Sequence, residues 1–171
     1  MKSVITLLIL LWSSHMIAQA PEGEMINFYG KITKMNLSDS VEKPLDGVKV
    51  EFWSDNKMLG EVYSAGKGKY SCNLPYRKVY LVKYGTEEYV QKLIEVDITK
   101  FYEDAEDLKA LKMEVDVALF KDTGLMGLDF MNQMPMAKAQ YIPRKKTLVW
   151  DYKHTEQMKN RILSVLSAYG Y

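Results

Sequence analysis

The feature that most constrains the fold is a period-two alternation of apolar and polar residues between residues 25 and 120. Successive side chains of a β-strand point to opposite faces, so this alternation predicts strands with one buried and one solvated face. Three short strands are predicted at 59–64, 69–74 and 79–84. Four more are marked by their apolar faces, which are Ile26, Phe28, Gly30 and Ile32; Val48, Val50 and Phe52; Ile94, Val96 and Ile98; and Met113, Val115, Val117 and Leu119. Seven short strands at this spacing predict an all-β, antiparallel sandwich.

Turn-forming residues separate these strands. Pro44-Leu-Asp-Gly47 precedes the second strand, Asp55-Asn56 suits a tight turn after it, and Ala65-Gly-Lys-Gly68 suits another. A further turn is predicted at Gly85-Thr86. Residues 99–110 break the alternation and are interpreted as a long connection with room for one helical turn.

The last third of the chain has a different pattern. Residues 121–152 lack a clear period and are predicted to wrap the sandwich as ordered loop with a short extended piece. Residues 153–169 are predicted to form an amphipathic helix, with Asp151 or Thr155 as its cap and Gly170 at its end. The apolar stripe of this helix is Met158, Ile162, Val165, Leu166 and Tyr169. Docking of the stripe on the domain is the expected arrangement, and binding to a partner or a membrane surface is the alternative.

The chain begins with the pattern of a secretory signal peptide. Lys2 is followed by the apolar run VITLLILLW and then by Ala18-Gln19-Ala20, a small-x-small cleavage signal. The run is too short for a comfortable membrane span. We therefore predict a leader at 1–20, a sandwich at 21–120 and a C-terminal extension at 121–171, with no transmembrane segment after cleavage. No cysteine lies at the end of the leader, so the expected protein is periplasmic or secreted and is not an N-terminally anchored lipoprotein.

Charge and cysteine content narrow the classes of function. The chain has 23 basic and 22 acidic residues, and one of the basic ones, Lys2, lies in the leader, so the exported chain balances at 22 of each. No overall field draws such a chain to nucleic acid or to an anionic membrane. Cys72 is the single cysteine, which excludes an intramolecular disulfide. Its place in an alternating strand predicts a small buried side chain, with a reactive or intermolecular thiol as the alternative.

Several strings resemble a known domain. They are GKITKMN, KPLDGVKVEFW, the turn GKYSCNL, VYLVKYG and KLIEVDI. Together they are similar to the carboxypeptidase regulatory-like domain, a transthyretin-like β-sandwich of secreted and envelope proteins of Bacteroidota. The closing stretch EVDVALF, LDF, PMAKAQY and LVWDYKHT is similar to the tail of a stand-alone secreted subgroup. In carboxypeptidases this domain is an appended, non-catalytic module, so the resemblance implies a fold and no peptidase activity.

The residues offer little for catalysis. His154 is the only histidine outside the leader, and its place at a helix start predicts a solvated or capping role. No serine or cysteine site is marked as a nucleophile for it to activate. The carboxylate pairs Glu87-Glu88 and Asp104/Asp107 fall on turns or connections, where a solvated role is the rule. Transthyretin-like hydrolases of the purine pathway use several histidines, so that activity is not carried over. We predict that the protein is not an enzyme and needs no cofactor.

A methionine cluster is the least usual motif. Met131, Met134 and Met136 lie within six residues. Closely spaced thioethers favour Cu(I), which makes them candidate ligands. The preferred interpretation is that these flexible side chains fill an irregular gap where the tail covers the sandwich.

Exposed aromatic and basic residues are the candidate contact surface. Trp53 is predicted to lie opposite the buried face of its strand. The stretch from Tyr141 to Tyr152 combines the aromatic rings of Tyr141, Trp150 and Tyr152 with the cations Arg144, Lys145 and Lys146. The leading hypothesis is a non-enzymatic exported module of the cell envelope for protein interaction or structural support. The alternatives are binding of a glycan or peptidoglycan through these rings, and a small enzyme or Cu(I)-binding protein. A flat aromatic row would favour a glycan, and an apolar surface would favour a protein partner.

The leader generates the first testable prediction. Native protein should begin after Ala20, because the leader is removed during export. Intact-mass measurement of protein purified from its own cells checks this. A native protein that starts at Met1, or one that fractionates with the cytosol, would contradict it.

Overall fold

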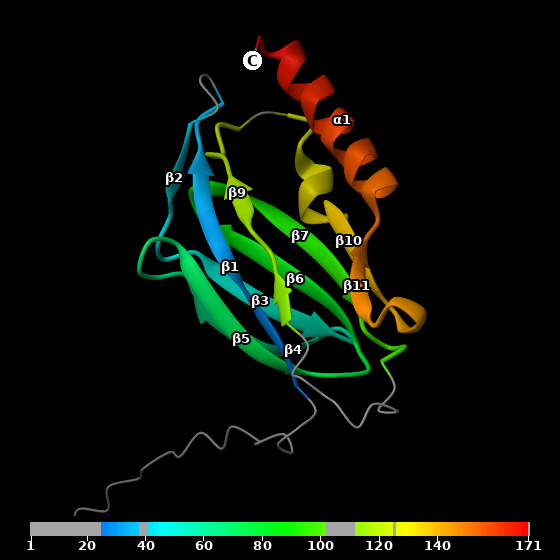
Figure 1. The fold of residues 1–171 in the computed structure, drawn as a ribbon. Coiled ribbons are helices and arrows are strands. Elements are labelled where there is room, and N and C mark those ends of the chain that lie inside the picture. Colours follow the sequence, from blue (N-terminus) through cyan, green and yellow to red (C-terminus); the bar gives the residue numbers. More distant parts are fainter. Residues whose placement is uncertain (1–24, 38–40, 102–111, 125, 171) are drawn as a thin grey trace, which may run out of the picture.

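The computed structural model describes residues 25–37, 41–101, 112–124 and 126–170. The predicted leader and most of the connection predicted at 99–110 lie outside these ranges. The chain forms two facing β-sheets with a helix at one end (Figure 1). Its elements are β1 (Met25–Met35), β2 (Glu42–Pro44), β3 (Lys49–Ser54), β4 (Lys57–Tyr63), β5 (Lys69–Pro75), β6 (Val79–Thr86), β7 (Tyr89–Asp97), β8 (Lys112–Glu114), β9 (Val117–Leu119), η1 (Asp129–Asn132), β10 (Ala137–Ile142), η2 (Pro143–Lys145), β11 (Thr147–Trp150) and α1 (Tyr152–Ala168).

The first sheet is organised around β1. On one edge β1 pairs antiparallel with β5 and then with β2, and on the other it pairs parallel with β8 and β9. The second sheet has the order β11-β10-β7-β6-β3-β4, and only its β10–β7 pair is parallel. The predicted all-β sandwich with a C-terminal helix is confirmed. The detail differs from seven antiparallel strands, because the described residues contain eleven strands and three of the pairings are parallel.

The predicted apolar faces form the core. Ile26, Phe28 and Ile32 on β1 have no exposed surface, and neither do Val50 and Phe52 on β3. Edge-to-face aromatic contacts join the two layers: the ring centroid of Phe28 lies 5.9 Å from that of Phe52 and 6.0 Å from that of Tyr80. Such pairs contribute about 0.5–1.5 kcal/mol beyond the area that they bury. The alternation in the sequence therefore identified the inward side of β1, β3 and β7.

A crossing at Gly30 fixes how β8 and β9 lie against β1. A Cβ atom on Gly30 would overlap the carbonyl oxygen of Val115, so the backbone between β8 and β9 occupies the place of a side chain. That carbonyl points into the core and accepts a hydrogen bond of 2.8 Å from the Tyr70 hydroxyl. The Tyr70 hydroxyl lies 2.9 Å from the hydroxyl of fully buried Tyr84. The predicted strand 113–119 is broken in two at this crossing, where the Asp116 carboxylate accepts from the backbone N–H of Lys31 at 2.7 Å.

The hairpin turns follow the expected chemistry with one shift. Asp55 and Asn56 both have positive φ, 51° and 59°, which matches the twist of a two-residue hairpin between β3 and β4. The turn predicted at Gly85-Thr86 lies two residues further on, at 87–88, since Thr86 still pairs with Tyr89. Gly85 marks a register shift inside β6, which extends the hairpin beyond the expected position.

The C-terminal third contributes strands as well as a helix, which corrects the loop predicted for 121–152. β10 adds in parallel to β7 and β11 returns beside it, so this hairpin extends the second sheet. The alternation in AKAQYI is weak because small Ala139 fills one inward position and Tyr141 the next. Hydrophobic periodicity is therefore a poor predictor of such a strand.

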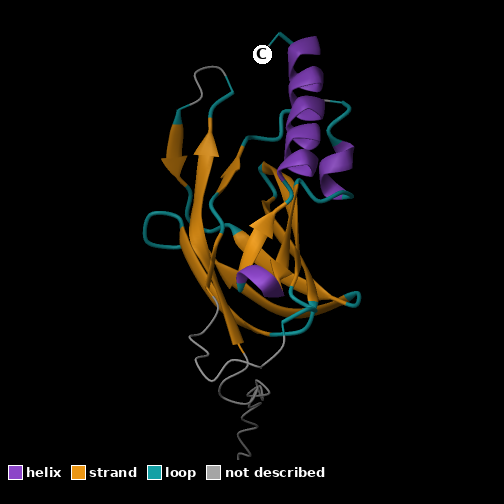
Figure 2. Ribbon diagram, turned by 45° about the vertical axis from the view of Figure 1, so that its right-hand side comes forward, coloured by secondary structure: helices purple, strands orange, loops and turns teal. Residues whose placement is uncertain are grey.

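Helix α1 closes one end of the sandwich, with η1 beside it (Figure 2). Its bounds agree with the predicted 153–169 to within one residue, and Asp151 caps it by accepting from the backbone N–H of His154 at 2.9 Å. Met158 and Leu166 are buried, and Ile162 and Val165 are partly buried. The apolar cluster under the helix consists of Val90, Phe120, Leu128, Phe130, Met131, Met136 and Met158. Docking of the stripe on the domain is thus the arrangement found. In the part of the chain that is described, no helix is long and apolar enough to span a membrane.

The crossing at Gly30 yields a second prediction. Gly30→Ala should destabilise the fold by about 3 kcal/mol or more, because the backbone of Val115 has to move away from a core position. Gly60→Ala is the matched control on a strand, since a Cβ there meets nothing within 4 Å, and it should change stability by at most about 1 kcal/mol. Urea unfolding midpoints of both variants check this. Equal midpoints would show that the crossing does not constrain the fold.

Candidate functional site

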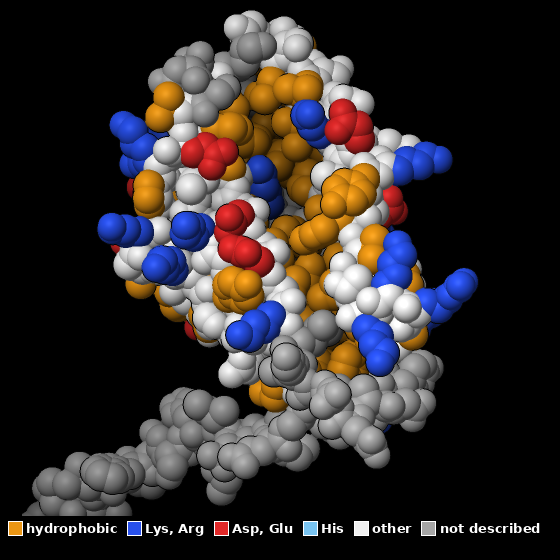
Figure 3. Space-filling view, in the orientation of Figure 1, with side chains coloured by type: hydrophobic (Ala, Val, Ile, Leu, Met, Phe, Trp, Pro, Cys, Tyr) orange, Lys and Arg blue, Asp and Glu red, His pale blue; other side chains and the backbone are white. Residues whose placement is uncertain are grey.

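A cleft lies along one side of the sandwich, between β8 of one sheet and β11 of the other. Further along this side the sheets are bridged, since the backbone N–H of Val90 donates to the carbonyl of Phe120 at 3.0 Å. Within the described residues β8 and β9 pair only with β1, and β11 pairs only with β10. A hollow of about 510 Å³ separates these edges. Figure 3 shows hydrophobic side chains along the hollow between the two walls. The volume falls within the range of about 300–1,000 Å³ usual for ligand sites.

The floor of the cleft is apolar because it is the core seen from its open side. Ile94 from β7 and Val115 from the crossing are buried, and Ala137 at the start of β10 is half-buried. These side chains belong to the central apolar cluster or pack against it. The floor is therefore as rigid as the core that supplies it.

One wall of the cleft is aromatic and stands on β11 and α1. Trp150 ends β11, is half-buried and packs against the core. Tyr152 begins α1 and is 75% exposed, and Thr155 lies one turn further along the helix. The start of the helix is held in place by His154, whose ring Nε2–H donates to the carbonyl of Pro135 at 2.7 Å.

The opposite wall is acidic. Glu114 on β8 lies beside Tyr29 in the register of the sheet, and Asp116 is held by its hydrogen bond to Lys31. Both carboxylates are exposed. The residues that line the cleft include these two acids and no lysine, arginine or histidine.

The structure divides the predicted contact residues. Trp150 and Tyr152 share the cleft, whereas Tyr141 is 7% exposed and packs edge-on against Phe101, with ring centroids 5.0 Å apart. Tyr141 is therefore a core residue, because its position on β10 points between the sheets, and it is withdrawn as an exposed contact. The basic residues Arg144, Lys145 and Lys146 are exposed in the turn at the far end of β11 from Trp150.

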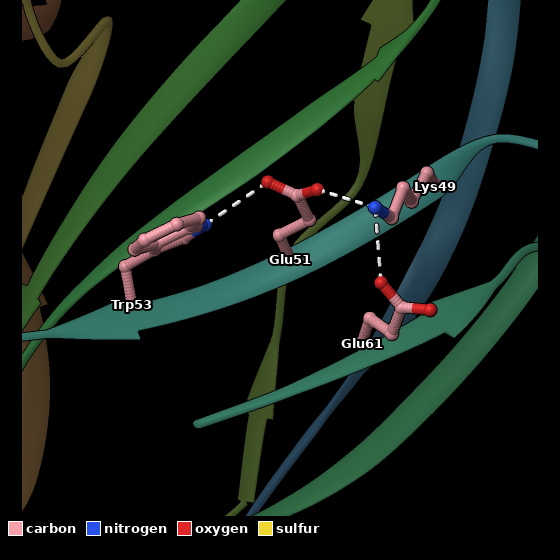
Figure 4. A network of polar contacts seen from close by, with 4 residues as sticks. All are labelled: Lys49, Glu51, Trp53 and Glu61. Atoms are coloured by element: carbon pink, nitrogen blue, oxygen red, sulfur yellow. Dashed lines mark hydrogen bonds and ion pairs between the residues drawn. The ribbon is translucent and has the colours of Figure 1, made fainter. Parts of the chain in front are cut away.

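Trp53 lies on the outer face of the second sheet, in a polar network with its neighbours (Figure 4). Its indole N–H donates to Glu51 at 3.0 Å, and the Lys83 ammonium lies 4.2 Å from the ring centroid. Lys49 bridges Glu51 at 2.6 Å and Glu61 at 3.0 Å. The hydrogen bond from Lys49 lowers the pKa of Glu51, and the two carboxylates raise the pKa of Lys49. Trp53 is half-buried and engaged on its own surface, away from the cleft.

The methionine cluster lies where the C-terminal segment packs under α1. Met131 and Met136 are buried under α1, and the exposed Met134 accepts from Arg161 at 3.6 Å. The guanidinium of Arg161 also covers Phe130, 3.9 Å from its ring centroid. Met131, Met134 and Met136 are thereby divided between the interior and the surface.

Cys72 is half-buried on β5, opposite Phe28. Burial raises the pKa of its thiol, which makes the thiolate scarcer at neutral pH. A thiol in this environment is a poor nucleophile.

Lys92 is an inward-facing cation that the sequence analysis did not single out. It lies on β7, half-buried, and its ammonium donates to the carbonyl of Ala118 on β9 and lies 5.6 Å from the centroid of the Phe120 ring. Burial lowers its pKa to about 8, against an opposing effect of Glu42. The alternation of β7 would have shown that residue 92 is inward, because it shares the phase of Ile94 and Val96.

Glu114, Asp116 and Thr155 were also missed as site residues. The alternation placed the two acids on a solvated face and the helical pattern placed Thr155 near a cap. Their common position depends on how β8 and α1 approach each other, which no local pattern records.

Comparisons with known proteins find only distant structural likenesses. No family model and no curated protein matches the chain. Among solved structures it is similar to 3-chlorocatechol 1,2-dioxygenase from Rhodococcus opacus 1CP, with 10% identity and a TM-score of 0.39 over 58% of this chain and 61% of that one. It is also similar to the Bacillus anthracis TIE protein, with 19% identity and a TM-score of 0.39 over 56% of this chain and 17% of that one. The group B streptococcus pilus 2b backbone protein matches with 14% identity and a TM-score of 0.37 over 60% and 42%. The chain thus spans about three fifths of the dioxygenase and less of the other two, and likenesses this low carry no argument about activity.

Lys92 yields a third prediction, for stability against pH. The folded-state pKa of about 8 lies below the unfolded value of about 10.4, so between these pH values the unfolded chain holds a proton that the folded chain has released. Stability should therefore rise with pH across this window, by up to about 3 kcal/mol. Above about pH 10 it should fall, because burial raises the pKa values of Tyr70 and Tyr84.

Lys92→Met should remove the rise between pH 8 and 10, since it removes the group that titrates. Lys112→Met, at an exposed position on β8, is the control and should keep the rise. Melting temperatures across this pH range check both. A variant Lys92→Met with the wild-type slope would show that another group is responsible.

Proposed function

We propose that this protein is a non-enzymatic, exported β-sandwich module of the cell envelope that binds a partner protein in the cleft between its sheet edges. The observation that carries the proposal is the cleft itself. Its apolar floor is continuous with the core, and its walls are the unpaired sides of β8 and β11. Concave sites in which a few polar groups converge on an apolar floor are the usual binding sites of folded proteins.

The arrangement of aromatic side chains supports a protein partner over a glycan. Flat stacking on a sugar polymer needs several exposed rings on one surface. Trp53 and Trp150 lie on β3 and β11, four strand spacings apart, which is about 19 Å. Tyr141, between the cleft and the basic turn, is buried. Trp53 also has its indole N–H and one ring face engaged by Glu51 and Lys83.

The chemistry of the reactive side chains supports a non-enzymatic role. The ring Nε2–H of His154 is used to hold the start of α1 against Pro135. The thiol of Cys72 has a raised pKa. The two cleft carboxylates are exposed to solvent, in contrast to the desolvated acids that do proton transfer at neutral pH.

The finer assignment is part of the same proposal. The turn and strand strings similar to carboxypeptidase regulatory-like domains suggest a stand-alone secreted member of that group from Bacteroidota, and the leader pattern suggests a periplasmic or secreted location. Both fit a module that acts by binding.

The fourth prediction is that a photo-crosslinking amino acid at Tyr152 will capture a discrete protein partner in intact cells. Tyr152 is 75% exposed, so the replacement should leave folding unchanged. The control is the same replacement at Tyr63, which is 57% exposed and lies on β4 at the other end of the second sheet. Adducts seen by immunoblot at Tyr152 and absent at Tyr63 are expected. Equal adducts at both positions, or none at Tyr152, would contradict the cleft as the binding site.

A further inference from the structure

We propose that the cleft recognises a lysine or arginine side chain presented by the partner protein. The inference rests on the proposed function and adds the chemistry of the occupant. It comes from the charge of the lining: Glu114 and Asp116 form one wall, Trp150 and Tyr152 form the other, and no basic side chain lines the cleft. Lys153 follows Tyr152 in the chain but is not among the lining residues.

The two walls and the floor fit the three parts of a long cationic side chain. A cation over the face of an indole or phenol ring is attracted by the ring quadrupole. A carboxylate opposite it accepts a charge-assisted hydrogen bond from an ammonium or guanidinium. The methylene stem of lysine or arginine packs along apolar surface, which Ile94, Val115 and Ala137 provide.

The recognition groups stand on ordered elements. Asp116 is fixed by its hydrogen bond to the backbone N–H of Lys31, which leaves its second oxygen for a ligand. Glu114 belongs to β8, and Trp150 is anchored by packing on the core. Groups already positioned in this way lose little conformational freedom on binding.

Some features near the cleft favour the opposite charge: the ammonium of Lys92 on β7 donates to the carbonyl of Ala118 on β9, and Lys153 follows Tyr152 in the chain. The N-terminus of α1 lies beside the cleft, and helix N-termini attract anions. In this structure the carboxylate of Asp151 already accepts from the backbone N–H of His154 there, which places a third acid near the aromatic wall. The residues that line the cleft itself carry acidic groups only, which favours a cationic occupant.

The fifth prediction is tested with small probes on the purified protein. Nα-acetyl-lysine amide and Nα-acetyl-arginine amide should shift the indole NMR signal of Trp150 and the methyl signals of Ile94, with weak affinity typical of a single side chain. Nα-acetyl-norleucine amide has a similar stem without charge and should bind about three- to tenfold more weakly. Salt raised to about 0.5 M should reduce that difference.

Glu114→Gln should weaken binding of the cationic probes about threefold or more and leave binding of the norleucine probe unchanged. Glu87→Gln, at an exposed position in the β6–β7 turn, is the matched control and should change neither. Unchanged melting temperatures for both variants show that the fold is kept.

The outcomes separate this inference from the proposed function. Equal binding of norleucine and lysine probes, better binding of an Nα-acetyl-glutamate amide, or an unaffected Glu114→Gln variant would overturn the cationic occupant. If crosslinks at Tyr152 persist in that case, the cleft still binds a protein through other chemistry. If the cationic probes bind but Tyr152 captures no protein, the occupant is a free amine, and the partner-protein assignment is overturned.

Discussion

The architecture depends on the close approach between Val115 and Gly30. A backbone carbonyl occupies the space of a side chain, and its hydrogen-bonding need is met inside the core by Tyr70, whose hydroxyl in turn meets that of Tyr84. A buried carbonyl without a partner costs free energy comparable to a lost hydrogen bond. Glycine in β1 and tyrosine in β5 and β6 are therefore one structural unit, contributed by strands of both sheets.

The same crossing creates the candidate site. Because the chain leaves the ladder at Val115 and Asp116, β8 and β9 are short and their outer side stays open toward β11. The acidic wall consists of Glu114 and Asp116, the solvent-facing residues of this interrupted strand. The aromatic wall comes from the opposite sheet, at the point where β11 passes into α1 through the capping residue Asp151. The cleft thus lies between two irregularities of the chain.

The elements that sequence reasoning found are those with a strong local signal. The alternation in β1, β3 and β7 and the stripe of α1 repeat over many residues, and the pair Asp55-Asn56 carries its own turn geometry. The hairpin of β10 and β11 was missed because Ala137 and Ala139 give β10 little hydrophobic contrast. Tyr141 was predicted to be exposed because it precedes the basic residues 144–146, and the weak alternation of β10 did not show that its side chain points inward. The position of Glu114 and Trp150 on opposite walls of one cleft depends on tertiary placement, which no window of sequence contains.

The parallel ladder on β1 has a consequence for how the chain folds. The backbone N–H of Lys31 donates its hydrogen bond to the carboxylate of Asp116, 85 residues further along the chain. A chain that emerges from its N-terminal end therefore presents β1 with one edge unpaired until nearly the whole sandwich has followed. Contacts of such long sequence separation slow folding, and an open strand edge invites pairing with other chains in the meantime. The first sheet can therefore be completed only after β8 and β9 have been synthesised. Until then the open edge of β1 is the part of the chain that most needs protection by a chaperone.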